Sequence, residues 1–384
     1  MAAPSGIQSA LSNGWRQFCE SVNPTKEQCR AYSAIRNCKT PRMGFNTMVC
    51  QDCGHQEIHY NSCRNRNCPN CQGLLKELWI DKRKAEVIDT PYFHLVATVP
   101  AELNPLFYAN QQVLYSLLLQ CVAETLLTLS ADKKYLGAVP GIIEVLHTWG
   151  QKLNYHPHIH CIVSGGGLSP DRKLVSKGSS FFLPAKVMAA MFRGKFLSHL
   201  QKLYSEDELM FSDSCLYLQN SYEWSSFRDS LYKKEWNIHV KETFNGKGNA
   251  IEYLGRYAYR IAITNARILS VTDKQVTFSY KDYRDNEKKT LTLCCEEFVR
   301  RFMMHVLPAG FQKIRYYGFL NNRSRKENLS LIFRLQGRQA FRSRFTGLQK
   351  VDILRLLWNV DIRRCAVCGK RSMTCTGHTQ PMLC

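Results

Sequence analysis

The chain has 384 residues, of which 45% are apolar, so it can bury a substantial core and favours two or three domains over one. Its 52 Lys and Arg residues outnumber 31 Asp and Glu residues, and the net charge of +21 is spread along the chain rather than held in one tail. This excess exceeds what solubility requires and predicts a partner rich in phosphates, with a merely basic cytoplasmic enzyme as the alternative.

The first residues, Met1-Ala-Ala-Pro-Ser-Gly-Ile-Gln, contain neither a basic flank nor an apolar run, so they do not resemble a signal peptide. We therefore expect a cytoplasmic protein with no membrane contact, associated with the nucleoid in a prokaryote. In a long cytoplasmic chain, 17 cysteines indicate metal binding more than disulfides.

The first cysteine cluster contains two CxxC pairs, Cys50/Cys53 and Cys68/Cys71. Their separation is close to that of four-thiolate zinc ribbons, so these four cysteines are predicted to share one structural zinc ion. The neighbouring Cys38 and Cys63 remain candidate ligands, either of a second site or as replacements in the first. Arg64 and Arg66 lie beside the predicted metal and are candidate DNA contacts.

The middle of the chain mixes predicted helices and strands without regular alternation of strand and helix. In order, the patterns predict a helix over 74–88, a strand over 92–99, buried helices over 103–129, and strands over 142–149 and 158–164 that end in a turn at Gly165–Gly167. They then predict helices over 183–204 and 224–236, a strand over 237–244, a helix over 250–263 capped by Asn249, a hairpin over 268–283, a strand near 290–293 and a helix near 296–305. This order favours an α+β domain with a central antiparallel sheet flanked by helices.

The segment His156-Pro157-His158-Ile159-His160 predicts a metal site. Successive side chains of a strand alternate faces, so His158 and His160 point the same way. Two imidazoles suit a divalent cation such as Mn²⁺ or Mg²⁺ and leave room for a third protein ligand, for which Gln151 and His147 are the nearest candidates.

A second motif, Tyr253-Leu-Gly-Arg-Tyr257, predicts a nucleophile. Residues four apart share one face of a helix, so Tyr253 and Tyr257 would present two hydroxyls to one site. A tyrosine beside a divalent cation suits attack on a phosphodiester, which leaves a 5′-phosphotyrosine and a free 3′-hydroxyl. The alternative is an aromatic helix face that only packs on the sheet. Four residues are candidate contacts to the DNA phosphates, namely Arg256, Arg260, Asn265 and Arg267.

The C-terminal cysteine cluster is less regular than the first. It contains Cys365, Cys368, Cys375, His378 and Cys384, which are candidate ligands of another zinc ion. The alternative is a reduced, flexible tail. The sequence also contains no GxxxxGK[ST] phosphate loop, so DNA unwinding would fall to a host helicase or to the replication machinery.

These motifs together resemble one family. The strings YNSCRNRNCPNCQG, LHTWGQKLNYHPHIHCIVSGGGLS and YLGRYAYRIAITNARI are similar to those of the rolling-circle transposases of the insertion-sequence-91 family, two-tyrosine HUH endonucleases related to common-region elements and Helitrons. The resemblance covers about residues 15–325 and implies a zinc-binding DNA-recognition domain (1–85) and an HUH-type nuclease domain (86–325). The remaining basic, Cys-rich C-terminal segment (326–384) lies outside it and is expected to form a zinc knuckle.

The resemblance also implies a mechanism. His158 and His160 would hold the cation, and Tyr253 and Tyr257 would be the nucleophiles that nick and join single-stranded DNA at hairpin-bearing element termini and at target DNA. A rolling-circle replication initiator or a relaxase shares this chemistry and is the nearest alternative. A zinc-dependent DNA-binding regulator that does not cut DNA is the alternative of a different class.

Overall fold

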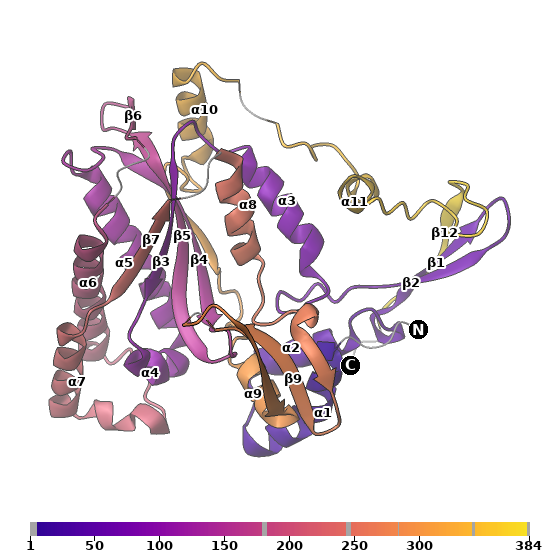
Figure 1. Ribbon diagram of the computed structural model, residues 1–384, viewed down its shortest axis with the longest axis horizontal. Coiled ribbons are helices and arrows are strands. Elements are labelled where there is room, and N and C mark those ends of the chain that lie inside the picture. Colours follow the sequence, from indigo (N-terminus) through magenta and orange to yellow (C-terminus); the bar gives the residue numbers. More distant parts are fainter. Residues whose placement is uncertain (1–5, 179–182, 243–246, 283, 340–341, 382–384) are drawn as a thin grey trace.

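A six-stranded antiparallel sheet lies at the centre of the computed structural model, which describes residues 6–178, 183–242, 247–282, 284–339 and 342–381 (Figure 1). The strand order is β11-β4-β5-β3-β7, and β6 pairs with β5 beyond this path. The strands are β3 (Tyr92–Thr98), β4 (Val139–Trp149), β5 (Tyr155–Leu168), β6 (Leu174–Ser176), β7 (Asn237–Glu242) and β11 (Ile314–Gly318).

One face of this sheet packs on a layer of helices, which Figure 1 shows on the left. These are α4 (Asn104–Ala109), α5 (Gln111–Ala131), α6 (Ala185–Ser205) and α7 (Ser221–Lys233). Alternate strand residues such as Leu95, Leu146 and Ile159 point into this core. Helix α5 is long and apolar enough to cross a membrane, but 67% of its apolar window is buried inside the protein. The expectation of a buried helix over this segment is therefore confirmed.

The side chains that alternate with these along the strands point to the opposite face of the sheet, which is covered by α3 (Gln72–Lys84) and α8 (Lys247–Ala258). Val145 and Ile162 of the sheet pack here with Trp79 of α3 and Ile251 of α8. The helix α10 (Arg325–Leu335) adds Ile332 to the same core. This face also carries the candidate site.

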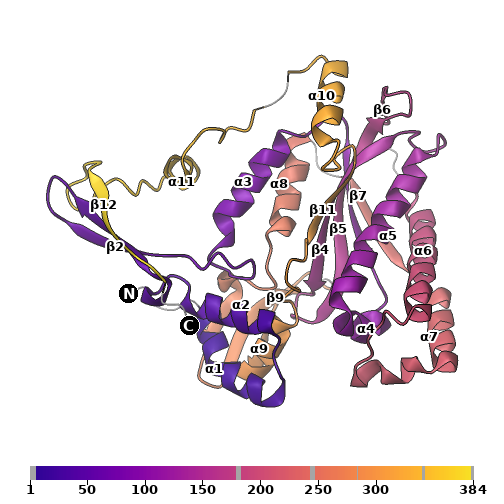
Figure 2. The same cartoon turned by 180° about the vertical axis from the view of Figure 1, so that it is seen from behind.

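A second unit lies below the sheet and is built from the N-terminal helices together with residues 268–303 (Figure 2). It contains α1 (Gly6–Ser21), α2 (Lys26–Asn37), α9 (Cys295–Met303) and the antiparallel sheet of β8 (Ile268–Val271), β9 (Gln275–Lys281) and β10 (Lys288–Cys294). A capping box between Thr25 and Gln28 starts α2, and the Gln28 amide also donates to the Met303 carbonyl at 3.0 Å. The N-terminal helices thus share one apolar core with residues that lie between β7 and β11 of the central sheet in the sequence.

A third sheet forms an arm that extends away from the rest of the molecule (Figures 1 and 2). Its strands are β1 (Phe45–Cys50), β2 (Gln56–Tyr60) and β12 (Met373–Thr379), with β1 in the middle, and α11 (Lys350–Trp358) precedes β12. Short 3-10 helices span Pro41–Met43, Ala101–Leu103, Asp213–Gln219 and Asn265–Arg267. The last strand of the described chain is therefore part of the N-terminal sheet.

The α+β class and its central antiparallel sheet are confirmed, but two local predictions are wrong. Gly165–Gly167 form no turn, because β5 continues to Leu168. A side chain would not fit there, since a Cβ on Gly167 would lie 2.1 Å from the Val139 carbonyl oxygen of the neighbouring strand. Asn249 does not cap its helix either, because α8 already begins at Lys247.

The contact between α8 and α3 depends on Gly255. A Cβ at this position would lie 2.3 Å from Cγ1 of Ile80 on α3. We therefore expect Gly255→Ala to lower the free energy of unfolding by about 1–3 kcal/mol, the usual cost of overpacking, as measured by urea denaturation. Gly194→Ala on α6 is the matched control, since nothing lies within 4 Å of its added Cβ; it should gain about 1 kcal/mol from helix propensity. Equal effects of the two changes would contradict the close packing.

Candidate active site

Four histidines lie on one face of the central sheet because of its register. His158 and His160 alternate along β5, and His147 on β4 pairs with His158. On β3, Val96 pairs with His160, so His94 two residues away shares the same face. All four imidazoles are buried, with relative exposures between 2% and 9%.

Three of these histidines form a candidate metal site. One ring nitrogen from each of His147, His158 and His160 lies within 4.8 Å of the others. The second ring nitrogen of two of them faces a carbonyl oxygen: His158 Nδ1 faces His156 O at 2.7 Å, and His147 Nε2 faces Tyr257 O at 2.7 Å. A carbonyl only accepts, so these nitrogens carry the protons and leave His158 Nε2 and His147 Nδ1 with a free lone pair.

The histidines are also held in the neutral form that binds metal. Burial lowers the pKa of His158 to about 4, and it lowers the pKa values of His147 and His160 well below the usual range of histidine. Each ring thus offers a lone pair at neutral pH. This donor set fits a divalent cation with positions left for water or phosphate oxygens.

His94 supports the site from the next strand. Its Nε2 lies 3.0 Å from Nδ1 of His160, and the two rings are stacked with centroids 5.3 Å apart. When His160 Nδ1 donates this hydrogen bond, its Nε2 is the nitrogen left for a cation. The His94 ring also meets the Tyr253 ring edge-on at 4.9 Å. His94 therefore contacts both a candidate ligand and a candidate nucleophile.

The two tyrosines of α8 lie over this histidine face, one helical turn apart. The Tyr257 hydroxyl donates to the Tyr253 hydroxyl at 2.8 Å. The Tyr257 ring lies 4.2 Å from the His160 ring, between centroids. The hydrogen bond from His147 to the Tyr257 carbonyl ties the same helix to the third histidine. Histidines and tyrosines thus form one packed cluster, whose parts come from β3, β4, β5 and α8.

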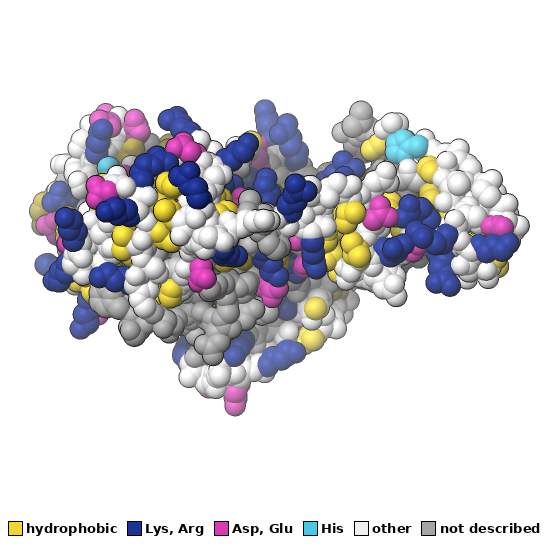
Figure 3. Space-filling model, turned by 90° about the horizontal axis from the view of Figure 1, so that it is seen from above, with side chains coloured by type: hydrophobic (Ala, Val, Ile, Leu, Met, Phe, Trp, Pro, Cys, Tyr) yellow, Lys and Arg dark blue, Asp and Glu magenta, His cyan; other side chains and the backbone are white. Residues whose placement is uncertain are grey.

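An open cleft of about 610 Å³ leads to the cluster. Its wall contains the three metal-site histidines and Tyr257, together with the basic residues Lys152, Arg260, Arg267, Lys281 and Arg284 and the acidic residue Asp282. Aromatic side chains of Trp149 and Tyr280 lie among them. The excess of cations favours a phosphate chain. Figure 3 shows basic side chains outnumbering acidic ones over the upper face and along the arm as well.

The residues expected to contact metal or DNA divide into two groups. Gln151 and Arg260 line the cleft. Arg267 also lines it, but its guanidinium donates to the carbonyls of Ser279 and Gln151, so it braces the cleft wall. The Arg256 side chain lies outside the described part of the chain.

Arg66 and Asn265 hold the protein together. Arg66 donates to the carbonyls of Leu307, Pro308 and Phe311 at 2.7–3.0 Å and thus braces this part of the fold, while its contact with DNA stays a prediction. Asn265 links Ile7 N with the Asn70 amide. Arg64 is exposed, and its contact with DNA stays a prediction.

The predicted cysteine site is corrected by the structure, which separates the two CxxC pairs. Cys68 and Cys71 lie with Cys38 and Cys63, whereas Cys50 and Cys53 lie with Cys365 and Cys368. The physical reason is that β1 and β2 carry the first pair out along the arm. Cys375 and His378 belong to neither group: the Cys375 thiol faces Gly377 O and the His378 ring faces the Asn46 amide. Cys384 lies outside the described residues.

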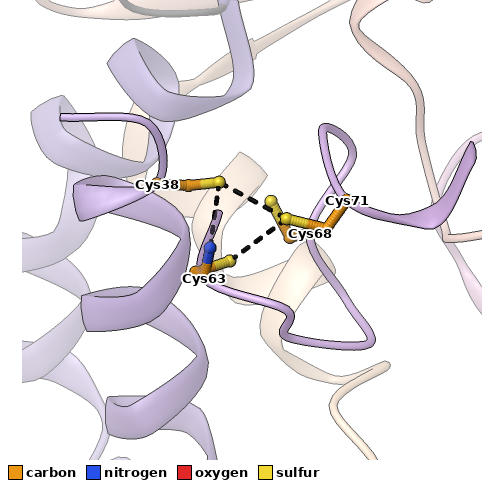
Figure 4. Close-up of side chains that lie close together, drawn as sticks. All are labelled: Cys38, Cys63, Cys68 and Cys71. Atoms are coloured by element: carbon orange, nitrogen blue, oxygen red, sulfur yellow. Dashed lines mark hydrogen bonds between the residues drawn. The ribbon is translucent and has the colours of Figure 1, made fainter. Parts of the chain in front are cut away.

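The group of Cys38, Cys63, Cys68 and Cys71 fits a structural zinc ion (Figure 4). Cys71 Sγ lies 3.4 Å from Cys38 Sγ and 3.6 Å from Cys63 Sγ. Tetrahedral zinc with Zn–S bonds of about 2.3 Å places its sulfurs about 3.8 Å apart, whereas a disulfide requires about 2.05 Å. The open alternative for Cys38 and Cys63 is thus resolved, since both join the second CxxC pair.

His94 is the residue of the cluster that the sequence pattern did not indicate. It lies in the strand predicted over 92–99, but its face depends on how that strand pairs with β5. His147 was one of two candidates for a third ligand, and the structure brings it to the histidine pair.

Comparisons with known proteins agree with this geometry. Residues 141–328 match the family model "Putative transposase", and residues 10–99 match "Transposase zinc-binding domain". The chain is 40% identical to "Putative transposase y4qJ" of Sinorhizobium fredii over 350 residues, 90% of this chain and 88% of the relative. It is 30% identical to "Transposase for insertion sequence element IS801" of Pseudomonas savastanoi pv. phaseolicola over 370 residues, 93% of this chain and 85% of the relative. No solved structure matches the chain.

His94→Phe should weaken divalent-cation binding at the histidines. The change keeps an aromatic ring of similar size but removes the nitrogen that faces His160 Nδ1. Loss of such a supporting hydrogen bond costs about 10- to 100-fold in metal affinity, which calorimetric titration with Mn²⁺ measures. His199→Phe, at a half-exposed histidine of α6, is the control and should bind Mn²⁺ normally. Unchanged affinity in His94→Phe would remove His94 from the site.

Proposed function

The chain belongs to the insertion-sequence-91 family of transposases, and from this we propose that it nicks and joins single-stranded DNA through tyrosine, in rolling-circle transposition. The observation that carries the proposal is that three neutral imidazoles and the Tyr257 ring line one basic cleft. A regulator that only binds DNA does not require a metal-binding cluster beside a tyrosine pair. The DNA substrate itself follows from membership of a transposase family.

Tyr257 is the proposed first nucleophile. It lines the cleft, whereas Tyr253 lies one turn back along α8 and is absent from that lining. Its oxygen attacks the scissile phosphorus, the bond from phosphorus to the 3′ oxygen breaks, and the strand keeps a 5′-phosphotyrosine while the 3′ oxygen takes up a proton. The energy of the broken ester is kept in the new one, so the reverse attack by a 3′-hydroxyl rejoins a strand.

Tyr253 is suited to a second strand. Its hydroxyl accepts a hydrogen bond from Tyr257 at 2.8 Å, so each phenol lies within reach of the other's position. When Tyr257 carries a DNA end, this hydrogen bond is lost and Tyr253 becomes the remaining phenol beside the histidines. One tyrosine then holds the element end while the other cleaves target DNA.

The histidines favour Mn²⁺ over Mg²⁺, because three nitrogen donors suit a transition-metal ion better than a strictly oxygen-seeking one. His147, His158 and His160 would hold the cation, which would supply positive charge to neutralise the non-bridging oxygens of the scissile phosphate. Arg260 and Lys152 in the cleft wall bind the flanking phosphates.

The cleft wall favours single strands over a duplex. Trp149 stacks on His147 at 4.4 Å between ring centroids, and Tyr280 lies under the Lys152 ammonium at 4.9 Å. Aromatic side chains beside a basic groove bind unpaired bases by stacking, and paired bases offer no free face. We propose that hairpin-bearing element termini provide this single strand, after unwinding by a host helicase or the replication machinery.

Covalent capture of DNA tests the nucleophile. A 5′-labelled and a 3′-labelled single strand carrying an element terminus are incubated with Mn²⁺, and adducts are resolved on a denaturing gel. We expect an adduct that retains the label of the 3′ segment. Tyr257→Phe should lower the rate of first cleavage by at least about 10³-fold, because it keeps the ring in the cleft wall but removes the attacking hydroxyl.

Tyr253→Phe should cut once at a near-normal rate but fail to transfer to a second strand. Tyr259→Phe, at the residue that follows the end of the same helix and faces Trp79, is the matched control and should keep both steps. Adducts that persist in the Tyr253→Phe/Tyr257→Phe double variant would contradict the mechanism. Binding of duplex DNA with no adduct on any single strand would instead favour the regulator.

Stacking in the cleft is tested separately by Tyr280→Leu. Loss of one stacked base costs about 1–3 kcal/mol, so we expect the dissociation constant for a single-stranded oligonucleotide to rise about 5- to 150-fold. Fluorescence anisotropy at fixed salt measures it. Tyr222→Leu, at a tyrosine of α7 that is 78% exposed, should leave binding unchanged. Equal losses for single-stranded and duplex DNA would count against the proposed preference.

A further inference from the structure

Two cysteine turns at opposite ends of the chain have the same backbone geometry. In each, the glycine after a CxxC pair has a positive φ, +72° at Gly54 and +73° at Gly369, and its N–H donates to the carbonyl of the first cysteine at 3.0 Å. The N–H of that first cysteine in turn donates to the carbonyl of the residue after the glycine, at 2.9 Å for Cys50 and 2.8 Å for Cys365. Such turns direct two thiols to one side.

The two turns face each other. Cys50 Sγ lies 3.6 Å from Cys368 Sγ, and Cys53 Sγ lies 3.6 Å from Cys365 Sγ. These distances are far longer than the 2.05 Å or so of a disulfide and close to the value of about 3.8 Å for thiolates on one tetrahedral zinc ion. All four thiols fall within 4.8 Å of one another.

The surrounding contacts reinforce the pairing of the turns. The Cys50 thiol meets the Ser372 hydroxyl at 3.2 Å, and Asp52 forms an ion pair with Lys370 at 2.8 Å. Gln51 N donates to Ser372 O at 3.0 Å, where β12 begins to pair with β1. The site therefore closes the end of the sheet of the arm.

The arm has too little apolar core to hold this sheet by itself. Its buried cluster consists of Met48, Cys50, Cys365 and Met373, so two of its four members are thiols. Ile58 on β2 is 53% exposed. Sheets with so small a core are held in known proteins by disulfides or structural metals. A metal ion bound by the four thiols would supply the stabilising free energy that the small apolar core does not.

We propose that Cys50, Cys53, Cys365 and Cys368 bind a second zinc ion, which fastens the C-terminal segment to the N-terminal hairpin. This ion is distinct from the one held by Cys38, Cys63, Cys68 and Cys71. The matched zinc-binding domain covers residues 10–99 and thus contains only half of the second ligand set. The arm is then one structural module that contains residues from the N-terminal hairpin and from the C-terminal segment.

The test is zinc content and strand protection in the full-length protein. By native mass spectrometry we expect two zinc ions in the wild type, one in Cys365→Ser/Cys368→Ser, and two in Cys375→Ser, which alters an exposed thiol of β12 outside the ligand set. Amides of Met373–Thr379 should exchange with deuterium at least about tenfold faster in the double variant than in the control. DNA cleavage is not a readout, so the result is independent of the proposed tyrosine chemistry.

Three results would overturn the proposal: two zinc ions in the double variant, one in the wild type, or equal exchange of β12 in both variants. If the double variant does not fold, the same question is tested by adding a chelator to the wild type and following zinc release together with the exchange of β12. The group that contains the exposed Cys53 should release its zinc before the group of Cys38, Cys63, Cys68 and Cys71, none of which is exposed, with faster exchange of β12 at that step. If the amides of β12 stay protected from exchange after both zinc ions are removed, the zinc ion does not fasten β12 to β1 and the proposal is wrong.

Discussion

The register of β4 and β3 against β5 is the constraint on which the candidate active site depends. Pairing of His147 with His158 and of Val96 with His160 brings the imidazoles of three strands to one face. A shift of one residue in either pairing would exchange the two faces of a strand and move apolar side chains into the site. The strand residues that alternate with these point to the other face and fill the core under α5. Packing of that core therefore fixes the register of the strands, and the register fixes the positions of the histidines in the candidate metal site. The geometry of the candidate site and the stability of the sheet therefore depend on the same hydrogen bonds.

Alternation along a single strand was enough to predict that His158 and His160 share a face, and four-residue spacing was enough for Tyr253 and Tyr257. These predictions use only local geometry. His94 could not be placed in this way, because its position follows from pairing with a strand that lies more than 60 residues away, at His160. The cysteines were misassigned for the same reason. Spacing along the chain joined Cys50 and Cys53 to the nearest CxxC pair, but in the folded chain their partners lie 318 and 312 residues further on.

The glycines show a related limit of prediction from local sequence. A run such as Gly165–Gly167 predicts a turn when it is judged by conformational freedom alone. In the folded chain these residues continue a strand, because neighbouring backbone and the Phe93 ring approach too closely for any side chain. Gly255 has a similar place in α8, where it admits Ile80 of α3. In both cases glycine serves close approach between elements, which depends on tertiary packing that a local pattern does not contain.

The place of β12 beside β1 has a consequence for synthesis of the protein. Thiols whose partners are 318 residues away emerge from the ribosome long before those partners exist. Until the last strand is made, β1 has an unpaired edge, which is the kind of surface that associates with other chains. A product that stops before residue 365 keeps the histidines and tyrosines but leaves that edge open. Complete pairing in the sheet of the arm therefore has to wait until residues 365–379 have been made.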